Sequence, residues 1–193
     1  MIMFDVRKGK FIVLLIGVCT LFSFPAFSET KSEKRYRVEL IIFRTTSNPG
    51  TDETEYGKPN LKDALPYAPI ESNKLVLTDA KRKLAKRHPT LIHTAWLQTA
   101  GTKDSPTKVH LQGGAELSNG THEVDGIVEI YPGKQFLITT DLAIYHPDKE
   151  QSSPAQIARF QTTNPVIFDE INYIQQSPYG MILMVTPEVT RRI

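Results

Sequence analysis

Residues 35–44 read RYRVELIIFR, and this stretch predicts a β-strand that decides the class of the fold. Apolar side chains recur at every second position, where an extended segment places them on one face: Tyr36, Val38, Leu40 and Ile42. Arg37 and Glu39 belong to the opposite face, which becomes apolar further on with Ile41 and Phe43. Apolar residues on both faces are typical of a strand that is covered on both sides at that end. We therefore expect a domain built on a sheet.

Strand patterns continue along the rest of the chain. They lie at residues 91–98, 108–114, 124–131, 135–146, 156–161, 167–175 and 180–185. Turn signals stand between the runs, at residues 101–106, Asn119-Gly120 and residues 131–134. The first two runs, the next two and the last two are expected to form antiparallel hairpins. Residues 182–185 are all apolar, which predicts a central strand covered on both faces, and Pro187 is expected to end it.

One short amphipathic helix is predicted over about residues 78–88. Thr78 is placed to cap its amino end, Asp79 suits the first turn, and Pro89 prevents continuation. Apolar positions recur at helical spacing: Leu77, Ala80, Leu84 and His88. The remaining face is basic, with Lys81, Arg82, Lys83, Lys86 and Arg87. This face is either a solvated helix surface or a patch that docks an anionic polymer or a charged partner protein.

The fold class that these patterns predict is α+β and strand-rich, a single domain on a mainly antiparallel sheet with one short helix and long polar loops. The longest loop spans residues 47–69, where proline, glycine and acidic residues disfavour regular structure. A connection of this length is either mobile or a partner-binding excursion.

The amino terminus has the pattern of a cleavable signal peptide over residues 1–28. Three basic residues, Arg7, Lys8 and Lys10, precede an apolar run at 11–24, and Ala26-Phe27-Ser28 supplies small residues before a cleavage site. The run is shorter than the roughly 20 residues that a membrane-spanning helix needs. Lipid attachment at Cys19 is the competing interpretation, but Val18 is bulky for it. We expect a periplasmic domain over residues 29–193 without a membrane span.

Removal of residues 1–28 would change the charge balance of the chain. The full sequence has 23 Lys and Arg against 21 Asp and Glu, and the signal contains three of the first group and one of the second. The remaining 20 of each leave a net charge of zero, which argues against nucleic-acid binding by general electrostatic attraction. The single cysteine, Cys19, would leave too, so neither a disulfide nor a thiol nucleophile is expected.

Motifs for catalysis, metal binding or cofactors are not found. The five histidines form no HExxH pair, and no GxSxG elbow or phosphate-binding glycine loop occurs. Asp125, Glu129 and Asp141 alternate onto one face of a predicted hairpin, which is the kind of carboxylate set that glycoside hydrolysis uses. Ordinary solvent-facing strand residues explain them better, so no catalytic residue, metal or cofactor is predicted.

Trp96 is the one tryptophan, and alternation places it on the same strand face as Gln98. A lone tryptophan usually belongs to a core. Alternatively, an aromatic ring with amide and hydroxyl neighbours stacks on a sugar and bonds to its substituents. His93, Trp96 and Gln98 are therefore candidate ligand-binding residues.

Several segments in order resemble the CsiV family of small periplasmic peptidoglycan-binding proteins. They are RYRVELIIFR, LIHTAWLQ, KVHLQGG, GIVEI with FLITTDLAIY, and EINYIQQSPYGMILMVTP. The His-x-x-Trp-x-Gln spacing and the hairpin with Gly180 are the most specific pieces. Gln176-Ser177 replace a usual Asp-His, and residues 164–168 replace an arginine cluster, which implies weaker or differently placed binding.

The resemblance implies a non-enzymatic, peptidoglycan-binding accessory protein that supports cell-wall synthesis and cell shape. Its expected partners are peptidoglycan and either a lipoprotein activator or a penicillin-binding wall synthase. The alternative is a protein-interaction adaptor for such a lipoprotein or synthase that does not bind glycan itself. A wall-cleaving enzyme would require the carboxylates of the hairpin to act together.

Overall fold

The structure is a computed structural model of the 193-residue chain, and it describes residues 34–45, 57–102, 104–145 and 156–188. All of these belong to one compact unit, Glu33–Ile193. The expected signal peptide and the first part of the predicted loop, up to residue 56, lie outside the described residues. In the described ranges, no helix is long and apolar enough to cross a bilayer.

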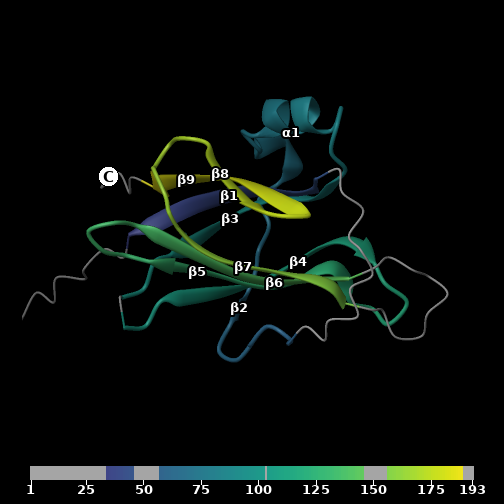
Figure 1. Cartoon of the computed structure of the whole chain (residues 1–193). Coiled ribbons are helices and arrows are strands. Elements are labelled where there is room, and N and C mark those ends of the chain that lie inside the picture. Colours follow the sequence, from purple (N-terminus) through teal and green to yellow (C-terminus); the bar gives the residue numbers. More distant parts are fainter. Residues whose placement is uncertain (1–33, 46–56, 103, 146–155, 189–193) are drawn as a thin grey trace, which may run out of the picture. The chain divides into compact units, whose positions relative to one another are not determined.

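The described strands form two sheets that lie one above the other (Figure 1). The four-stranded sheet has the order β3 (Thr90–Thr99), β1 (Arg35–Arg44), β9 (Tyr179–Glu188) and β8 (Asn172–Gln176). The five-stranded sheet has the order β2 (Leu65–Pro66), β4 (Thr107–Glu116), β5 (His122–Tyr131), β6 (Leu137–Tyr145) and β7 (Gln156–Pro165). Every pairing is antiparallel except that of β2 with β4. The prediction of a strand-rich, mainly antiparallel fold is confirmed, with the strands divided between two sheets.

The hydrophobic core lies between the sheets. The predicted inner face of β1 supplies Val38, Leu40 and Ile42, all without exposed area, and β5 and β6 supply Val128 and Ile138 from the other side. Burial of each such side chain stabilises the fold by about 1.5–3 kcal/mol. The apolar side chains that alternation assigns to the inner face of each strand therefore hold the two sheets together.

The predicted hairpin of β3 with β4 does not form, and this expectation is wrong. These strands belong to different sheets, and Gly101 and Pro106 form only an isolated bridge between them. Both strands turn their apolar faces to the same core, so they face each other across it. Gly101 has a φ of 66°, which lets the chain turn sharply from one sheet to the other.

The hairpins of β5 with β6 and of β8 with β9 form as predicted. Strand β9 is central, because β1 and β8 flank it, but it does not end at Pro187, which pairs with Tyr36 of β1. Strand β8 reaches only as far as Leu183 along β9, so a proline beyond that point has a single neighbouring strand and is tolerated.

Two segments differ in length from their predictions. Strand β7 continues to Pro165, four residues beyond the predicted end, whereas residues 166–171 form a turn in place of a strand. The Asn172 side chain stabilises this turn, since its amide donates to the carbonyls of Ile167 and Glu170 and its oxygen accepts from Ile167 N. In the predicted loop, the two residues of β2 pair with β4.

The single helix of the described residues, α1 (Thr78–Leu84), is shorter than predicted and follows the 3-10 turn η1 (Ser72–Lys74). Leu77, and not Thr78, is the N-cap of the helix, and its side chain forms no capping hydrogen bond. The carboxylate of Glu39 in β1 takes that role from outside, because it accepts hydrogen bonds from Val76 N and Leu77 N at 3.0 and 2.7 Å. Helix α1 lies against the outer face of the four-stranded sheet (Figure 1).

Candidate functional site

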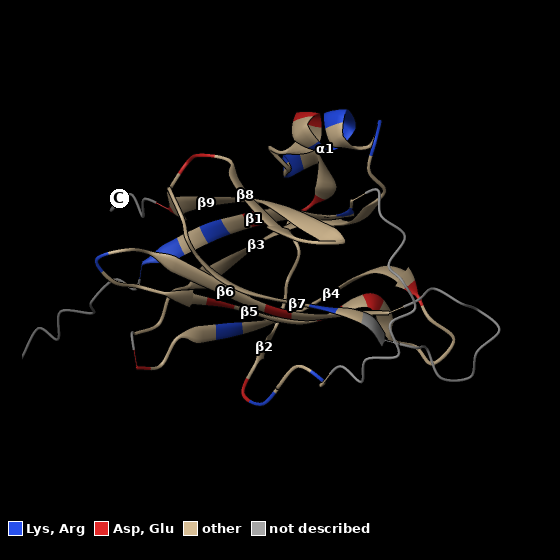
Figure 2. Cartoon of the chain, in the orientation of Figure 1, with Lys and Arg blue, Asp and Glu red and all other residues tan. Residues whose placement is uncertain are grey.

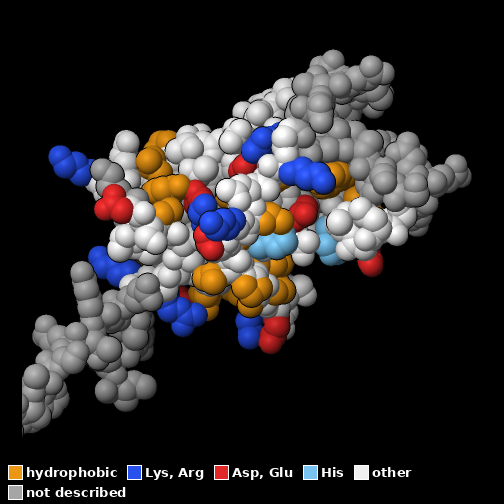
Figure 3. Space-filling view, turned by 90° about the horizontal axis from the view of Figure 1, so that it is seen from below, with side chains coloured by type: hydrophobic (Ala, Val, Ile, Leu, Met, Phe, Trp, Pro, Cys, Tyr) orange, Lys and Arg blue, Asp and Glu red, His pale blue; other side chains and the backbone are white. Residues whose placement is uncertain are grey.

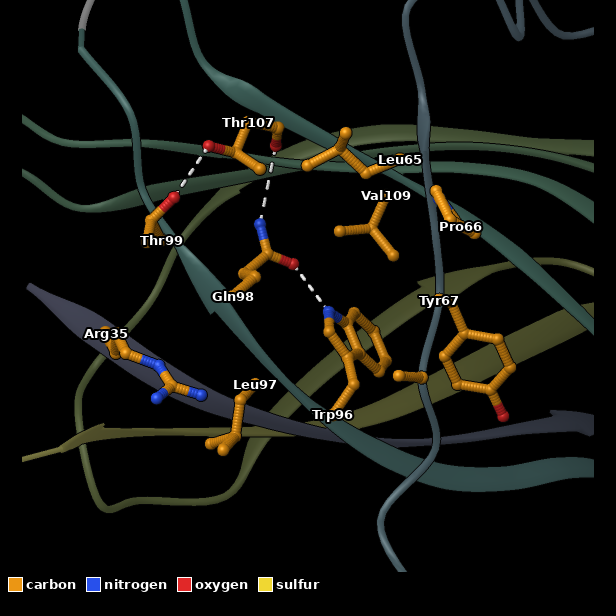
Figure 4. A pocket seen from close by; sticks show the side chains of 11 residues that line it. Arg35, Leu65, Pro66, Tyr67, Trp96, Leu97, Gln98, Thr99, Thr107 and Val109 are labelled. Atoms are coloured by element: carbon orange, nitrogen blue, oxygen red, sulfur yellow. Dashed lines mark hydrogen bonds between the residues drawn. The ribbon is translucent and has the colours of Figure 1, made fainter. Parts of the chain in front are cut away.

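The structure places Trp96 in the core, with 1% of its surface exposed. Its indole Nε1 donates to Gln98 Oε1 at 2.6 Å, and Gln98 Nε2 in turn donates to the carbonyl of Thr107 at 3.4 Å (Figure 4). Tyr67 packs edge-on against the indole, with the ring centroids 5.9 Å apart. The polar atoms of Trp96 and Gln98 are thus satisfied within the fold, and the indole presents no open face for a sugar.

A hollow of about 210 Å³ adjoins this pair (Figure 4). Leu65, Pro66 and Tyr67 form one wall of it, and Arg35 also belongs to its lining (Figure 4). Its volume is below the roughly 300–1,000 Å³ of most ligand sites. His93 does not contribute to it, since residues 93 and 96 lie on opposite faces of β3.

His93 belongs instead to a buried network on the outer face of the four-stranded sheet. Its Nε2 lies 3.0 Å from Glu39 Oε1, and Arg37 donates to the other oxygen of Glu39 at 3.0 Å. Burial raises the pKa of Glu39, but the hydrogen bonds from Val76 N, Leu77 N, His93 and Arg37 lower it more, so its pKa lies below the ordinary value. The network keeps a carboxylate charged inside the protein and fixes the segment before α1.

The basic residues of the helix region are all exposed, on α1 and the turn that follows it: Lys81, Arg82, Lys83, Lys86 and Arg87. Arg82 forms an ion pair with Asp79 at 2.9 Å. These five residues form an exposed, positively charged surface, and we call it the helix patch.

The three carboxylates of the β5–β6 hairpin share one outer face of the five-stranded sheet, as predicted, and Figure 3 shows acidic, basic and histidine side chains close together on that side of the molecule. Each carboxylate has its own partner. Asp125 meets His110 at 2.5 Å, Glu129 meets Lys108 at 3.2 Å, and Asp141 accepts two bonds of 2.7 Å from Arg159.

Glu129 also accepts a hydrogen bond from the hydroxyl of Tyr131. Burial, together with this bond, raises the pKa of Tyr131 to about 12. Each of the three carboxylates is therefore held by a side chain from a neighbouring strand of the same sheet.

A larger hollow of about 610 Å³ lies at one end of the two sheets. Its lining residues come from three separate parts of the chain: Lys34, Tyr36, Pro132, Gly133, Lys134, Gln135, Phe136, Pro165, Val166, Ile167 and Phe168. We call it the end groove. It contains the start of β1, the β5–β6 turn and the connection that follows β7, and none of its lining residues is acidic.

Three aromatic rings form the floor of the end groove. The centroid of Phe136 lies 4.7 Å from that of Phe168 and 4.8 Å from that of Tyr36, and Tyr36 and Phe168 are 5.7 Å apart. The backbone bond from Val166 N to Phe136 O, at 2.9 Å, ties the third segment to the start of β6. Ile167 stands at the rim with 60% of its surface exposed. The floor is therefore fixed by packing while the rim is open to solvent.

The charges of the end groove are positive. Figure 2 shows basic residues on the β5–β6 turn and at the start of β1, at the same end of the two sheets. Sequence reasoning missed this site because each segment contributes only one or two characteristic residues. A turn lysine two residues before an aromatic residue, Lys134 with Phe136, is the one local signal that the sequence contains.

Two facing sheets with an open, basic and aromatic groove at one end define a β-sandwich domain with the features of a binding protein. Residues 58–188 match the family model described as peptidoglycan-binding protein CsiV, and the chain therefore belongs to the CsiV family. Strand β1 precedes the matched range. No curated protein and no solved structure matches the chain.

Proposed function

We propose that this protein binds peptidoglycan through the end groove, as a non-enzymatic accessory protein of cell-wall synthesis and cell shape. Membership of the CsiV family supports the ligand. The observation that carries the site is the end groove itself, where Lys34 and Lys134 flank an aromatic floor without an acidic neighbour in its lining. Its volume of about 610 Å³ lies within the usual range of ligand sites.

The chemistry of the groove suits a polymer that is both anionic and partly apolar. Two ammonium groups attract carboxylates, and the rings and Ile167 offer apolar surface that a ligand would remove from water. Peptidoglycan has both properties. With this ligand, the proposed location is the periplasm, where residues 1–28 would act as the cleaved signal and residues 29–193 as the working domain.

A second function is favoured by the helix patch. Five exposed cations on α1 and the turn behind it suit an acidic surface of a partner protein, and the proposed partners are a lipoprotein activator or a penicillin-binding wall synthase. In this adaptor hypothesis, peptidoglycan binding is not required. The two hypotheses place binding on different surfaces, so substitutions separate them.

Retention on purified sacculi tests the proposed function. Ile167→Glu places a negative charge at the rim of the end groove, where it would repel carboxylates without disturbing the packed floor. We expect the wild-type protein in the pellet and about tenfold weaker retention of this variant, equivalent to about 1.4 kcal/mol.

Ile171→Glu is the matched control, because Ile171 is also exposed, at 57%, and does not line the groove. It should be retained like the wild type. Recovery of the wild-type protein entirely in the unbound fraction would overturn the proposed function. Equal loss for both variants would remove the end groove from it.

A further inference from the structure

The polar groups of the end groove are of an unusual kind for a sugar site. Its side chains offer the ammonium groups of Lys34 and Lys134, the amide of Gln135 and the hydroxyl of Tyr36. Ammonium groups only donate hydrogen bonds, and the lining has no carboxylate that could accept hydrogen bonds from the hydroxyls of a ligand. A sugar chain presents many hydroxyls that need acceptors as well as donors. The groove therefore favours a ligand that is rich in hydrogen-bond acceptors, such as carboxylates.

The two lysines are available for such a ligand. No carboxylate of the described residues forms an ion pair with either of them, whereas the neighbouring Arg35 and Arg37 pair with Glu188 and Glu39. Both are exposed; Lys34 directly precedes β1, and Lys134 lies in the turn between β5 and β6. Two cations from separate parts of the chain that line one groove can contact two separate carboxylates of one ligand.

The aromatic floor is also poorly shaped for a flat sugar ring. Phe136 and Phe168 meet at 63°, and Tyr36 stacks on Phe168 at 22°, so the rings pack largely against one another. Phe136 and Phe168 are only partly buried, and their open surface is an irregular apolar one, with Pro165 and Ile167 beside it. Such a surface suits methyl and methylene groups, which are found in peptide side chains.

From this chemistry we propose that the end groove binds the peptide of peptidoglycan, with its several carboxylates, and not the sugar chain. This inference rests on the proposed function, because it names the part of the polymer that the same site takes. The carboxylates contact Lys34 and Lys134, and the apolar part of the peptide covers Phe136, Phe168 and Ile167. The sugar chain stays outside the groove.

Three probes test the inference with the protein produced from its full-length chain: intact sacculi, sugar strands freed of peptide by an amidase, and the isolated peptide. The isolated peptide is also used with its carboxylates converted to amides. We expect intact sacculi and the free peptide to bind, with about tenfold weaker binding of the amidated peptide and of the stripped strands. The stripped strands keep one lactyl carboxylate per disaccharide, so their binding shows whether the peptide is needed. The amidated peptide shows whether the charge of the carboxylates is needed.

The variant Lys34→Gln/Lys134→Gln should weaken binding of the free peptide about tenfold, since each exposed charge contact changes the affinity by a few-fold. The control Lys81→Gln/Lys83→Gln removes the same charge from the helix patch and should bind like the wild type. Equal binding of stripped and intact strands, with no binding of the peptide, would overturn the inference and leave the proposed function in place. Failure of intact sacculi to bind would instead remove the proposed function.

Discussion

A single carboxylate, that of Glu39, joins three parts of the structure. It belongs to β1, it accepts hydrogen bonds from the backbone before α1, and it contacts His93 of β3. Only 1% of its surface is exposed, so its charge would be unfavourable without these partners. Its hydrogen bonds fix a seven-residue helix that is too short to be stable alone.

Glu39→Gln should lower the free energy of unfolding by about 2–4 kcal/mol, because an amide cannot accept all of these hydrogen bonds and leaves Arg37 and His93 without their anion. Urea unfolding at pH 7 measures the effect. Glu71→Gln is the control, since Glu71 is exposed and its pair with Lys74 at 3.2 Å should contribute at most about 1 kcal/mol. Equal stability of the two variants would contradict the role of Glu39.

The same residue predicts a dependence on pH. The pKa of Glu39 is lower in the folded state than its ordinary value of 4.5, because the hydrogen bonds to the charged form outweigh burial. Its stabilising contribution is therefore present above about pH 4.5 and is lost as the pH falls through the folded pKa. Unfolding curves of the wild type and Glu39→Gln should converge in acid. A difference that stayed constant down to pH 2 would exclude this mechanism.

At the scale of elements, the free edge of β7 is covered by a side chain from the other sheet. Gln176, at the end of β8, accepts a hydrogen bond from Gln161 N at 2.9 Å and donates to the carbonyl of Arg159 at 3.4 Å. A side-chain amide thus takes the place of a neighbouring strand, which protects the edge from pairing with another molecule. Gln176 is one of the residues at which the sequence departs from the pattern that it resembles.

Strand β9 depends on a close contact between its backbone and an aromatic ring. Phe43 of β1 packs directly on Gly180, where an added Cβ would lie 2.4 Å from Phe43 Cζ. Gly180→Ala should therefore destabilise the protein by about 1–3 kcal/mol through overpacking. Thermal unfolding measures this change.

The contact itself is tested by adding Phe43→Leu, which removes the ring. The double variant should lose less stability than the sum of the two single variants. Strictly additive losses would show that the effect of Gly180→Ala does not come from Phe43.

For the molecule as a whole, the arrangement of the sheets was harder to predict than the strands. Alternation in residues 35–44 assigns each side chain to a face, but it does not say which strand lies beside β1. The neighbours of β1 are β3 and β9, the latter about 140 residues away along the chain. The turn at 101–106 looked like a hairpin because pairing within a sheet and crossing between sheets use similar turn residues.

The candidate site, too, could be predicted only in part from the sequence. Trp96 and Gln98 were predicted to share a face, and they do, but periodicity does not distinguish an inner face from an outer one. The end groove could not be predicted at all, because Tyr36, Phe136 and Phe168 come together only when both sheets are assembled. The helix patch was predicted residue by residue, because it is local to one segment.

The positions of the charges predict how binding responds to salt. Lys34 and Lys134 are exposed, so their attraction for carboxylates should be screened as the Debye length falls from about 10 Å at 0.1 M to about 3 Å at 1 M. Sacculus retention should therefore weaken with added NaCl in the wild type, and less in Lys34→Gln/Lys134→Gln. Retention that is insensitive to salt would place binding on the apolar floor alone.

The position of β1 has a consequence for the order of events during synthesis. This strand is made early, yet one of its two neighbours, β9, is made after the other strands of the described residues. A growing chain cannot complete the four-stranded sheet before residues 179–188 are available, and the edge of β1 that β9 covers stays unpaired until then. Chains that stop short of β9 would leave this edge of β1 open to proteases and to pairing with other chains.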